Sequence, residues 1–314
     1  MSQYQVAVNL ELTSKCNARC VMCPREAVLH PRAMQLEILR QAISRLSPSD
    51  VFRTVIAGYG EPTTHPKFEE CMQIISQSKV RMDMVSNGQL LDQERLKLMD
   101  GVLDTLIISF SSITPQVYEA VHVNLDQQQV MENIILAQQS LKSTKLAISL
   151  TPLLNCIETL PQTINWLREQ GVENLSMSPS LYDRAGSLDE TNKQEANLRK
   201  IIKQYNLRSQ ELDFVPSVRD IYAQWRSNRF QCIPRNTDLV IAADGSYQYC
   251  FNDMGHSHPL GDVSKIGIRE VLQIREKTVE NPDLCGNCSI RNRYRPVELA
   301  RAAYGYARTL AKSA

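Results

Sequence analysis

The chain has 314 residues, 43% of them hydrophobic, which is enough to bury a large core and argues against a disordered protein. Lys and Arg total 35 and Asp and Glu total 34, so the formal net charge is +1. A charge this close to zero argues against the basic surface of a protein that binds nucleic acid or anionic lipid, and we expect no nucleic-acid partner.

The N-terminal segment carries no targeting or membrane signal. MSQYQVAVNLELTSKC has no basic stretch followed by a long apolar run and a small-residue cleavage site. We therefore expect a cytoplasmic protein with no membrane partner. Thiols stay reduced in the cytoplasm, so the nine cysteines are expected to bind metal or act in catalysis rather than form disulfides.

Strand-like and helix-like segments alternate up to about residue 180, as in βα units around a parallel sheet. Apolar, β-branched runs predict strands at 6–12, 53–58, 81–85, 105–110, 145–150 and 174–178. Apolar residues at every third or fourth position predict helices at 35–46, 67–78, 92–99, 130–141 and 160–169. A complete eight-unit barrel usually needs about 250 residues, so we predict an α/β fold built on a partial (β/α)6 TIM-like barrel.

The sequence changes character beyond residue 184. A polar, charged and helical stretch without further strand alternation is expected up to about residue 229. Segments 239–242 and 247–251, joined through an Asp-Gly turn, then predict a β-hairpin, and helices follow at 268–276 and from about 297. We predict a barrel core at 1–184, a helical linker at 185–229 and a small C-terminal domain of β-hairpin plus helix at 230–314.

Three cysteines, Cys16, Cys20 and Cys23, follow the first expected strand on one loop. The loops after the strands of a TIM-like barrel carry its active site, so the position suits catalysis. Three thiolates can hold three irons of a [4Fe–4S] cubane and leave the fourth iron open to a small molecule. Structural zinc is the alternative, but it needs a fourth ligand, and the nearest histidine, His30, stands alone.

The C-x3-C-x2-C spacing after a first strand resembles the radical S-adenosylmethionine (radical SAM) superfamily. Gly60 and Glu61, in Gly-Tyr-Gly-Glu-Pro at the end of the second strand, resemble the family's Gly-Glu-Pro motif, which binds the amino group of the cofactor. Glycine lets the backbone approach a ligand closely, and Glu61 offers an acceptor for an ammonium group.

Polar residues at the ends of later strands extend this resemblance. Ser86 and Asn87, in Ser-Asn-Gly, are similar to the family's polar contact to the ribose. Four more positions lie where the family contacts the methionine carboxylate or the adenine: Ser109, Ser111, Ser176 and Ser178. Each motif alone is better explained as a turn, but together their order and their places at strand ends favour the family.

Two positions depart from the family. Met22, directly before Cys23, stands where the family often has an aromatic residue, which should loosen packing against the adenine. His122 stands where relatives often carry Arg.

Four further cysteines lie in the C-terminal segment: Cys232, Cys250, Cys285 and Cys288. They resemble the twitch-type auxiliary domain, the shortened relative of the SPASM domain, in which such a set binds one extra [4Fe–4S] cluster. No cysteine follows Cys288, so one auxiliary cluster is expected. A four-cysteine zinc knot is the alternative, because a hairpin and a C-x2-C turn suit zinc as well.

The two remaining cysteines lie outside both sets. Cys71 is on the apolar side of an expected helix and should pack in the core. Cys156 follows the fifth strand on the catalytic side, where some epimerases of the superfamily use a thiol to donate hydrogen to the product radical; an ordinary buried thiol is the alternative. Residues 182–184, after the sixth strand, are candidates for substrate contact, with a surface ion pair as the alternative.

The resemblance implies S-adenosyl-L-methionine and two [4Fe–4S] clusters as cofactors, and a low-potential electron donor such as flavodoxin or ferredoxin as a partner. It implies that a 5′-deoxyadenosyl radical abstracts hydrogen from the substrate. Relatives with this architecture dehydrogenate or epimerise aminocyclitols and sugars, or epimerise and crosslink ribosomal peptides.

The choice between these substrate classes rests on one feature. The first strand starts near residue 6, which leaves no room for a leader-peptide recognition domain. A small-molecule or natural-product substrate is therefore expected, with a peptide as the runner-up. A noncatalytic iron–sulfur electron carrier or a zinc-stabilised scaffold is the alternative from a different class.

Overall fold

A computed structural model describes residues 4–151, 153–179, 195–227, 232–253, 255–286, 288 and 295–313. The candidate substrate residues 182–184 and the expected boundary at 184 lie outside these described ranges.

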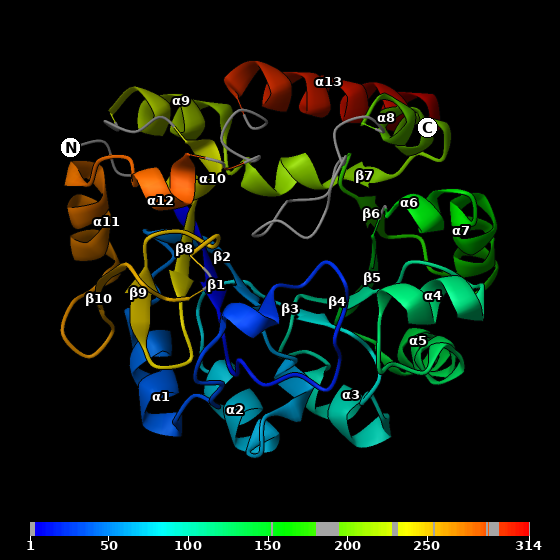
Figure 1. The fold of residues 1–314 in the computed structure, drawn as a ribbon, viewed down its shortest axis with the longest axis horizontal. Coiled ribbons are helices and arrows are strands. Elements are labelled where there is room, and N and C mark those ends of the chain that lie inside the picture. Colours follow the sequence, from blue (N-terminus) through cyan, green and yellow to red (C-terminus); the bar gives the residue numbers. More distant parts are fainter. Residues whose placement is uncertain are drawn as a thin grey trace.

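The six strands expected from the sequence form the central part of one sheet. They are neighbours in chain order, and every pair is parallel. Their bounds are β1 Val6–Leu10, β2 Val51–Ile56, β3 Met82–Ser86, β4 Thr105–Ser109, β5 Lys145–Leu150 and β6 Leu175–Met177. The sheet curves without closing, which confirms the prediction of a partial TIM-like barrel (Figure 1).

Helices cover the outer face of this sheet, as βα units require (Figure 1). All five amphipathic segments are helical within a few residues of their expected bounds. In chain order the outer helices are α1 Leu36–Arg45, α2 Phe68–Ile75, α3 Gln93–Met99, α4 Pro115–Val121, α5 Gln127–Ser140, α6 Leu154–Ile157 and α7 Leu160–Glu169.

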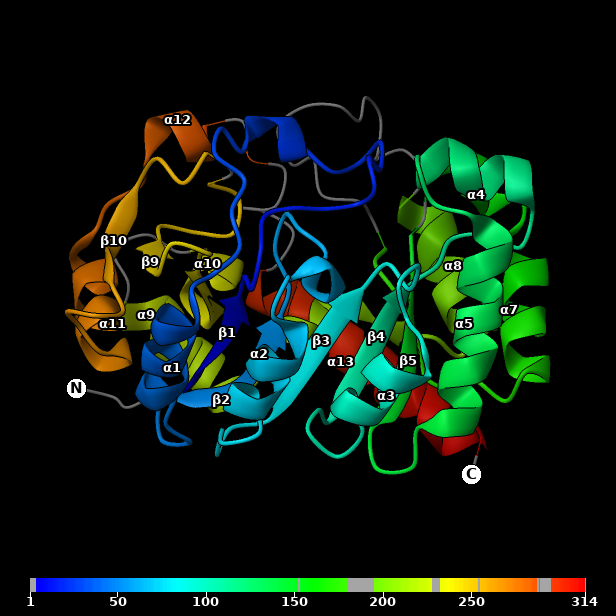
Figure 2. The same cartoon turned by 90° about the horizontal axis from the view of Figure 1, so that it is seen from below.

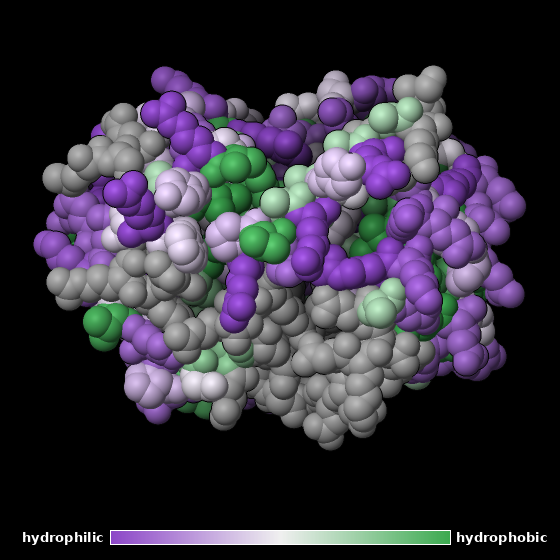
Figure 3. Space-filling model, turned by 90° about the horizontal axis from the view of Figure 1, so that it is seen from above, coloured by the Kyte–Doolittle hydropathy of each residue, from purple (hydrophilic) through white to green (hydrophobic). Residues whose placement is uncertain are grey.

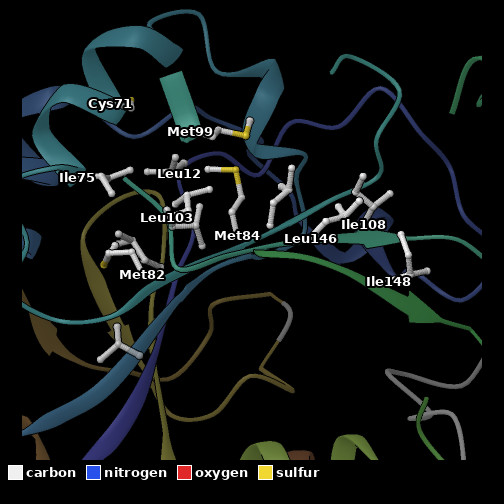
Figure 4. Packing of buried hydrophobic residues seen from close by; sticks show 14 of the residues in the cluster. Leu12, Cys71, Ile75, Met82, Met84, Met99, Leu103, Ile108, Leu146 and Ile148 are labelled. Carbon is white, nitrogen blue, oxygen red and sulfur yellow. The ribbon is translucent and has the colours of Figure 1, made fainter. Parts of the chain in front are cut away.

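Successive side chains of a barrel strand point alternately to the hydrophobic core under the helices and to the barrel interior. Val6, Val8 and Leu10 of β1 are fully buried in the main hydrophobic cluster, whereas Ala7 and Asn9 between them are not part of it. Figure 4 shows side chains of this cluster, such as Met82 and Met84 of β3, packed together. The opposite strand face is therefore left to line the interior.

The sheet extends beyond the six expected strands on both sides. A two-residue strand, β7 Arg208–Ser209, pairs in parallel with β6, in a segment where no further strand was expected. On the other side β8 Asp238–Ile241 pairs in parallel with β1 and antiparallel with β9 Ser246–Gln248, which pairs with β10 Pro259–Asp262. The expected hairpin is present, and it continues the barrel sheet.

Five of the remaining elements, α8, η4, α9, α10 and α13, lie around the gap between β7 and β8, whereas α11 packs on β10. The terminal helix α13 packs on β7, α8 and η4, and α10 packs on α9, η4 and β8 (Figures 1 and 2). Their bounds are α8 Glu195–Gln204, η4 Gln210–Phe214, α9 Val218–Ser227, α10 Ile233–Thr237, α11 Ile268–Lys277, α12 Pro282–Cys285 and α13 Pro296–Ser313.

On the face that carries α9 and α13, most of the described residues are hydrophilic, and the hydrophobic ones form small separate groups (Figure 3). Within the described ranges, no helix combines the length and the apolar character that crossing a bilayer demands.

Charged residues meet near the amino ends of the barrel strands. Arg53 of β2 lies 3.8 Å from Asp83 of β3 and 3.7 Å from Asp213 of η4. Ala7 is in register with both Arg53 and Asp238, so Asp238 of β8 joins the same layer. Burial raises the pKa of Asp238 to about 7, although the positive charges of Arg53 and Arg275 act in the opposite direction.

Replacing Asp238 by Asn should change how stability depends on pH. The pKa of this carboxyl in the folded state lies above its ordinary value of 3.8, so the folded protein keeps a proton that the unfolded chain releases. Stability is therefore lost as the pH rises from about 4 to about 7. Relative to wild type, Asp238→Asn should gain up to about 3 kcal/mol between about pH 5 and about pH 8 in urea unfolding. A difference that is constant over this range would contradict the assignment.

Candidate functional site

The loop that carries the first three cysteines leaves β1 and lies against the end of α4. The backbone N–H groups of Arg19 and Val21 donate to the carbonyls of Val123 and Val121 at 2.8 and 3.0 Å. The guanidinium of Arg25 donates to the carbonyls of two loop residues, one of them Cys16 at 3.1 Å. These bonds give the cysteine loop a fixed path at the carboxyl edge of the sheet.

The three thiols of this loop lie within electrostatic reach of one another. Burial raises the pKa of Cys20 to about 12, and the charges of Cys23 and Cys16 add to the effect. The pKa of Cys16 is also raised by burial, and Glu61 and Cys23 contribute. Burial and mutual repulsion both disfavour free thiolates here, and bound iron would offset both effects, so the donor set fits an iron cluster with three protein ligands.

Gly60 lies directly under the start of the cysteine loop. A Cβ atom at this position would be 2.1 Å from the carbonyl oxygen of Thr13 and 2.4 Å from that of Lys15. The next residue is held to the same strand end, because the N–H of Glu61 donates to the Lys15 carbonyl at 2.9 Å. The glycine of the Gly-Glu-Pro motif is thus required by the close approach of two backbone segments.

Gly60→Ala should disrupt the site. Both obstructing atoms belong to the backbone, so one segment must move, which we expect to cost about 1–3 kcal/mol and to displace the cysteine loop. Thermal unfolding and iron content after anaerobic reconstitution measure the two effects.

The matched control is Gly305→Ala in α13, where no described atom outside the neighbouring helix backbone lies within 4 Å of the added Cβ. Because alanine is the better helix former, this variant should unfold slightly later and keep its iron. Equal behaviour of the two variants would show that the Gly60 contacts do not matter.

The carboxylate of Glu61 is buried and accepts its hydrogen bonds from within the chain. Oε1 accepts from the N–H of Thr63 at 3.1 Å, from its hydroxyl at 2.7 Å and from the Ser86 hydroxyl at 2.8 Å, and Oε2 accepts from the N–H of Asn87 at 2.7 Å. Burial raises the pKa of Glu61 while these bonds act to lower it. The side chain therefore ties the end of β2 to the end of β3, and direct contact with an ammonium group stays a prediction.

Asn87 connects the Ser-Asn-Gly motif to the cysteine loop. Its side-chain amide donates to the amide oxygen of Asn17 at 2.8 Å. Asn17 follows the first cysteine directly. The structure therefore brings together three of the motifs that the sequence singled out, at the carboxyl ends of β1, β2 and β3.

Two of the four serines predicted to contact the cofactor, Ser109 and Ser176, lie on β4 and β6, and Ser149 of β5, which was not predicted, lies between them. Ser109 ends β4 in register with Ser149 of β5, which is in register with Ser176 of β6. Gln210 of η4 donates to the hydroxyls of Ser149 and Ser176 at 2.6 and 3.4 Å. Ser178 follows β6 and is buried. Local sequence patterns gave no sign of Gln210, because it reaches this row of hydroxyls from beyond the sixth strand.

Ser111 and Cys156 lie together but away from solvent. Both are fully buried, and Cys156 packs with Val121, Leu153 and Met22, the last from the cysteine loop. Burial raises the pKa of Cys156, and the nearby Ser111 side chain opposes that shift. Cys156 thus lies beneath the cysteine loop, and its thiol is not exposed.

The four C-terminal cysteines line one pocket, together with Arg235, Tyr249 and Phe251. The set comprises Cys232, Cys250, Cys285 and Cys288. They come from the start of α10, the end of the hairpin, the end of α12 and the residues after it. Figure 2 shows α12 on the same side of the molecule as the loop that follows β1.

Electrostatics and hydrogen bonds connect these four thiols. Burial, together with the charges of neighbouring thiolates, raises the pKa of Cys232 to about 11 and that of Cys250 to about 12. The N–H of Asn252 donates to the Cys250 sulfur at 3.3 Å, and the charge of Arg235 lowers the pKa of Cys232.

The donor set of this pocket fits a cubane cluster. Across the described ranges, no three Cys, His, Asp or Glu side chains converge closely enough to bind one metal ion. A [4Fe–4S] cubane takes four thiolate ligands, one at each iron corner. Four thiols around one pocket supply such a set.

Tyr59 joins this pocket to the Gly-Glu-Pro motif. Its hydroxyl donates to the carbonyl of Phe251 at 2.7 Å, one residue after Cys250. Its backbone N–H donates to Glu11 Oε1 at 2.8 Å, and Glu11 Oε2 accepts from the N–H of Ala243 in the hairpin turn at 3.2 Å. Sequence reasoning missed Glu11, a buried acidic residue just after β1; a carboxylate inside an apolar strand run was the available signal.

Cys71 lies apart from both cysteine sets. It is fully buried in the main core, and its sulfur lies 3.4 Å from Nδ1 of His65. The expectation that this thiol packs in the core is confirmed.

Curated relatives of this chain include probable GTP 3′,8-cyclases. The enzyme from Methanococcus maripaludis (strain C5) is 25% identical over 187 residues, which cover 55% of this chain and 60% of the relative. The chain therefore matches less than two thirds of the length of that protein.

Solved structures of three proteins share the fold. SuiB of Streptococcus suis, bound to S-adenosylmethionine, superposes with a TM-score of 0.67 at 13% identity over 92% of this chain and 71% of its own. The protein anSMEcpe with bound AdoMet gives 0.64 at 16% identity over 98% and 97%. BtrN in complex with AdoMet and 2-DOIA gives 0.54 at 14% identity over 92% and 94%.

The family itself is established by sequence. The profile of the radical SAM superfamily matches residues 10–167, half of the chain. The matched region runs from the end of β1 into α7 and contains the three-cysteine loop, the Gly-Glu-Pro motif and the Ser-Asn-Gly motif. The chain belongs to the radical SAM superfamily.

Proposed function

We propose that this chain is a radical SAM enzyme that abstracts hydrogen from a small-molecule or natural-product substrate and thereby dehydrogenates or epimerises it. An aminocyclitol or a sugar is the substrate class we favour. The observation that carries the proposal is the set of bonds joining the cysteine loop to the strand-end motifs. The Asn17–Asn87 and Glu61–Asn87 hydrogen bonds and the Lys15–Glu61 backbone bond make one polar site of three separate motifs.

In this proposal Cys16, Cys20 and Cys23 bind a [4Fe–4S] cluster, and the strand-end motifs hold S-adenosylmethionine beside it. When bound, the two cofactors supply the 5′-deoxyadenosyl radical that abstracts hydrogen. The chain itself positions the cofactor. Gly60 provides room for close backbone approach, and Glu61 fixes the ends of β2 and β3, which present Ser86 and Asn87.

We assign the four-cysteine pocket to one auxiliary [4Fe–4S] cluster of the twitch type, in a C-terminal domain that covers 230–314. The barrel core at 1–184 and the linker at 185–229 complete the proposed division. All four sulfurs would be used as cluster ligands, so the cluster has no open iron for substrate and serves electron transfer. The Tyr59–Phe251 hydrogen bond supports this role, because it holds the Gly-Glu-Pro segment of the cofactor site against the loop that carries Cys250.

A row of polar side chains lies at the carboxyl ends of β4 to β6. Ser109 and Ser176 are the expected cofactor contacts, and Ser149 and Gln210 beside them are available to a hydroxyl-bearing substrate. Ser109, Ser149 and Ser176 are partly exposed and stand side by side, and Gln210 adds an amide. Hydroxyls and amides both donate and accept, which suits the hydroxyl groups of a sugar or cyclitol. BtrN has been solved in complex with AdoMet and 2-DOIA, and the probable cyclases are named for a nucleotide substrate.

Peptide modification is the second candidate, by epimerisation or crosslinking. SuiB has been solved with its precursor peptide SuiA, and its fold covers 92% of this chain. Cys156 would be the hydrogen donor of an epimerase, but its thiol is fully buried beneath the cysteine loop. Access to the substrate radical would then require the loop to move.

The first experiment measures the 5′-deoxyadenosine released from S-adenosylmethionine after anaerobic reconstitution of the protein. Dithionite supplies the electron in place of the flavodoxin or ferredoxin that we expect as the natural donor. Wild type and Cys71→Ala should release it, and Cys20→Ala should release none, because a cubane without this ligand is not held. Release by Cys20→Ala would refute the cluster assignment. No release by wild type would favour an electron carrier or a zinc scaffold.

Deuterated substrates separate the two substrate classes. A perdeuterated aminocyclitol or sugar that is a substrate transfers deuterium to 5′-deoxyadenosine, which mass spectrometry detects. Transfer from a peptide deuterated at its α-carbons, and from no sugar or cyclitol, would replace our proposal by the peptide alternative.

A further inference from the structure

His122 contacts the sulfur of Cys20. Its ring nitrogen Nδ1 lies 3.4 Å from Cys20 Sγ, within hydrogen-bond distance for a sulfur acceptor. The imidazole is 1% exposed. A buried polar contact to one thiol of the cysteine loop therefore comes from the end of α4, outside the loop itself.

The backbone fixes this contact from both sides. The N–H groups of Arg19 and Val21, which flank Cys20, donate to the carbonyls of Val123 and Val121, which flank His122. The two side chains are thus placed opposite each other by the pair of backbone bonds around them. The arrangement does not depend on the flexibility of a long side chain.

The rest of the imidazole is held by packing. Its ring stacks on Tyr118 with the ring centroids 4.6 Å apart, and the N–H of His122 donates to the Tyr118 carbonyl at 2.7 Å as the last bond of α4. In the part of the chain that is described, Nε2 has no hydrogen-bond partner. The sulfur of Cys20 is therefore the polar contact that the ring makes, and a purely structural histidine would leave a buried polar group for no gain.

We propose that His122 donates a hydrogen bond from Nδ1–H to the Cys20 thiolate and thereby raises the reduction potential of the [4Fe–4S] cluster that this loop binds. The proposal rests on Cys20 being a cluster ligand. A cluster-bound thiolate carries no proton, so the imidazole must be the donor. Hydrogen bonds to the sulfurs stabilise the more negative, reduced cluster, which makes it easier to reduce.

His122→Leu and His122→Asn separate donation from packing. Leucine fills similar space without a donor, whereas the amide nitrogen of asparagine lies close to the place of Nδ1. In a potentiometric titration followed by EPR, the ratio of reduced to oxidised cluster at a fixed potential should fall about tenfold in His122→Leu, which is about 59 mV for one electron. His122→Asn should recover most of this shift. The signal to follow is the one that changes when S-adenosylmethionine is added.

Proton ENDOR on the holoenzyme provides a second test, which is independent of the reduction potential. An exchangeable proton coupled to this cluster should be present in the wild type, disappear in D2O and be absent in His122→Leu. An unchanged potential in His122→Leu with four irons retained at this site would overturn the proposal, as would equal shifts in both variants. If the proposed function itself were wrong, the result would be different again, because the wild type would then show no EPR signal that responds to S-adenosylmethionine.

Discussion

Replacing Cys16, Cys20 and Cys23 together by Ala should lower the iron content from about eight to about four atoms per chain, with an equal fall in sulfide. The three thiols are the ligands that we assign to one cubane, and the second set of four lies in a separate pocket. Loss of the first cluster should therefore leave the second in place. Iron, sulfide and zinc are measured after anaerobic purification, and 5′-deoxyadenosine release should be zero.

Cys71→Ala is the matched control for this experiment, because Cys71 is a buried cysteine that contacts His65 in the core and belongs to neither set. It should keep about eight irons. About one zinc with four irons in the wild type would leave a radical enzyme whose C-terminal pocket is structural. A wild type without iron would contradict both cluster assignments.

The strands and helices of the barrel were predictable because each is specified locally. Val6, Val8 and Leu10 alternate with residues that face the interior, and the helices repeat their apolar residues every three or four positions. β7 was missed because a strand of two residues shows no period at all. The sequence did not predict that the hairpin extends the barrel sheet. β8 pairs with β1, more than 200 residues earlier in the chain, and local sequence patterns do not encode such a pairing.

The residues of the candidate site likewise fall into those that local sequence patterns identify and those that they do not. The cysteine spacings and strand-end motifs are contiguous in sequence, so they could be recognised, and the hydrogen bonds of Asn87 and Glu61 join them. Tyr59 and Gln210 act across the fold, on Phe251 and on two barrel serines, and neither lies next to its partner in the chain. Residues that connect separate elements depend on the tertiary arrangement.

Changing Cys285 and Cys288 together to Ala should uncouple cofactor cleavage from product formation. The two sulfurs lie on one C-x2-C turn and are half of the ligand set of the auxiliary pocket, so the second cluster should be lost. The barrel cysteines keep their own loop, which is held by backbone bonds to the end of α4. Release of 5′-deoxyadenosine should therefore persist within about twofold, while product per 5′-deoxyadenosine falls more than about tenfold.

The outcome depends on which role the auxiliary cluster has. If it takes an electron from the substrate radical or supplies one to it, single-turnover product is lost even with excess dithionite, because the radical has no redox partner in the site. Unchanged single-turnover product in this variant, with four irons remaining, would mean that the pocket stabilises the hairpin and α12 without exchanging electrons. Loss of both clusters would show instead that the Tyr59–Phe251 contact couples the two sites structurally, and Tyr59→Phe would then lose iron from both.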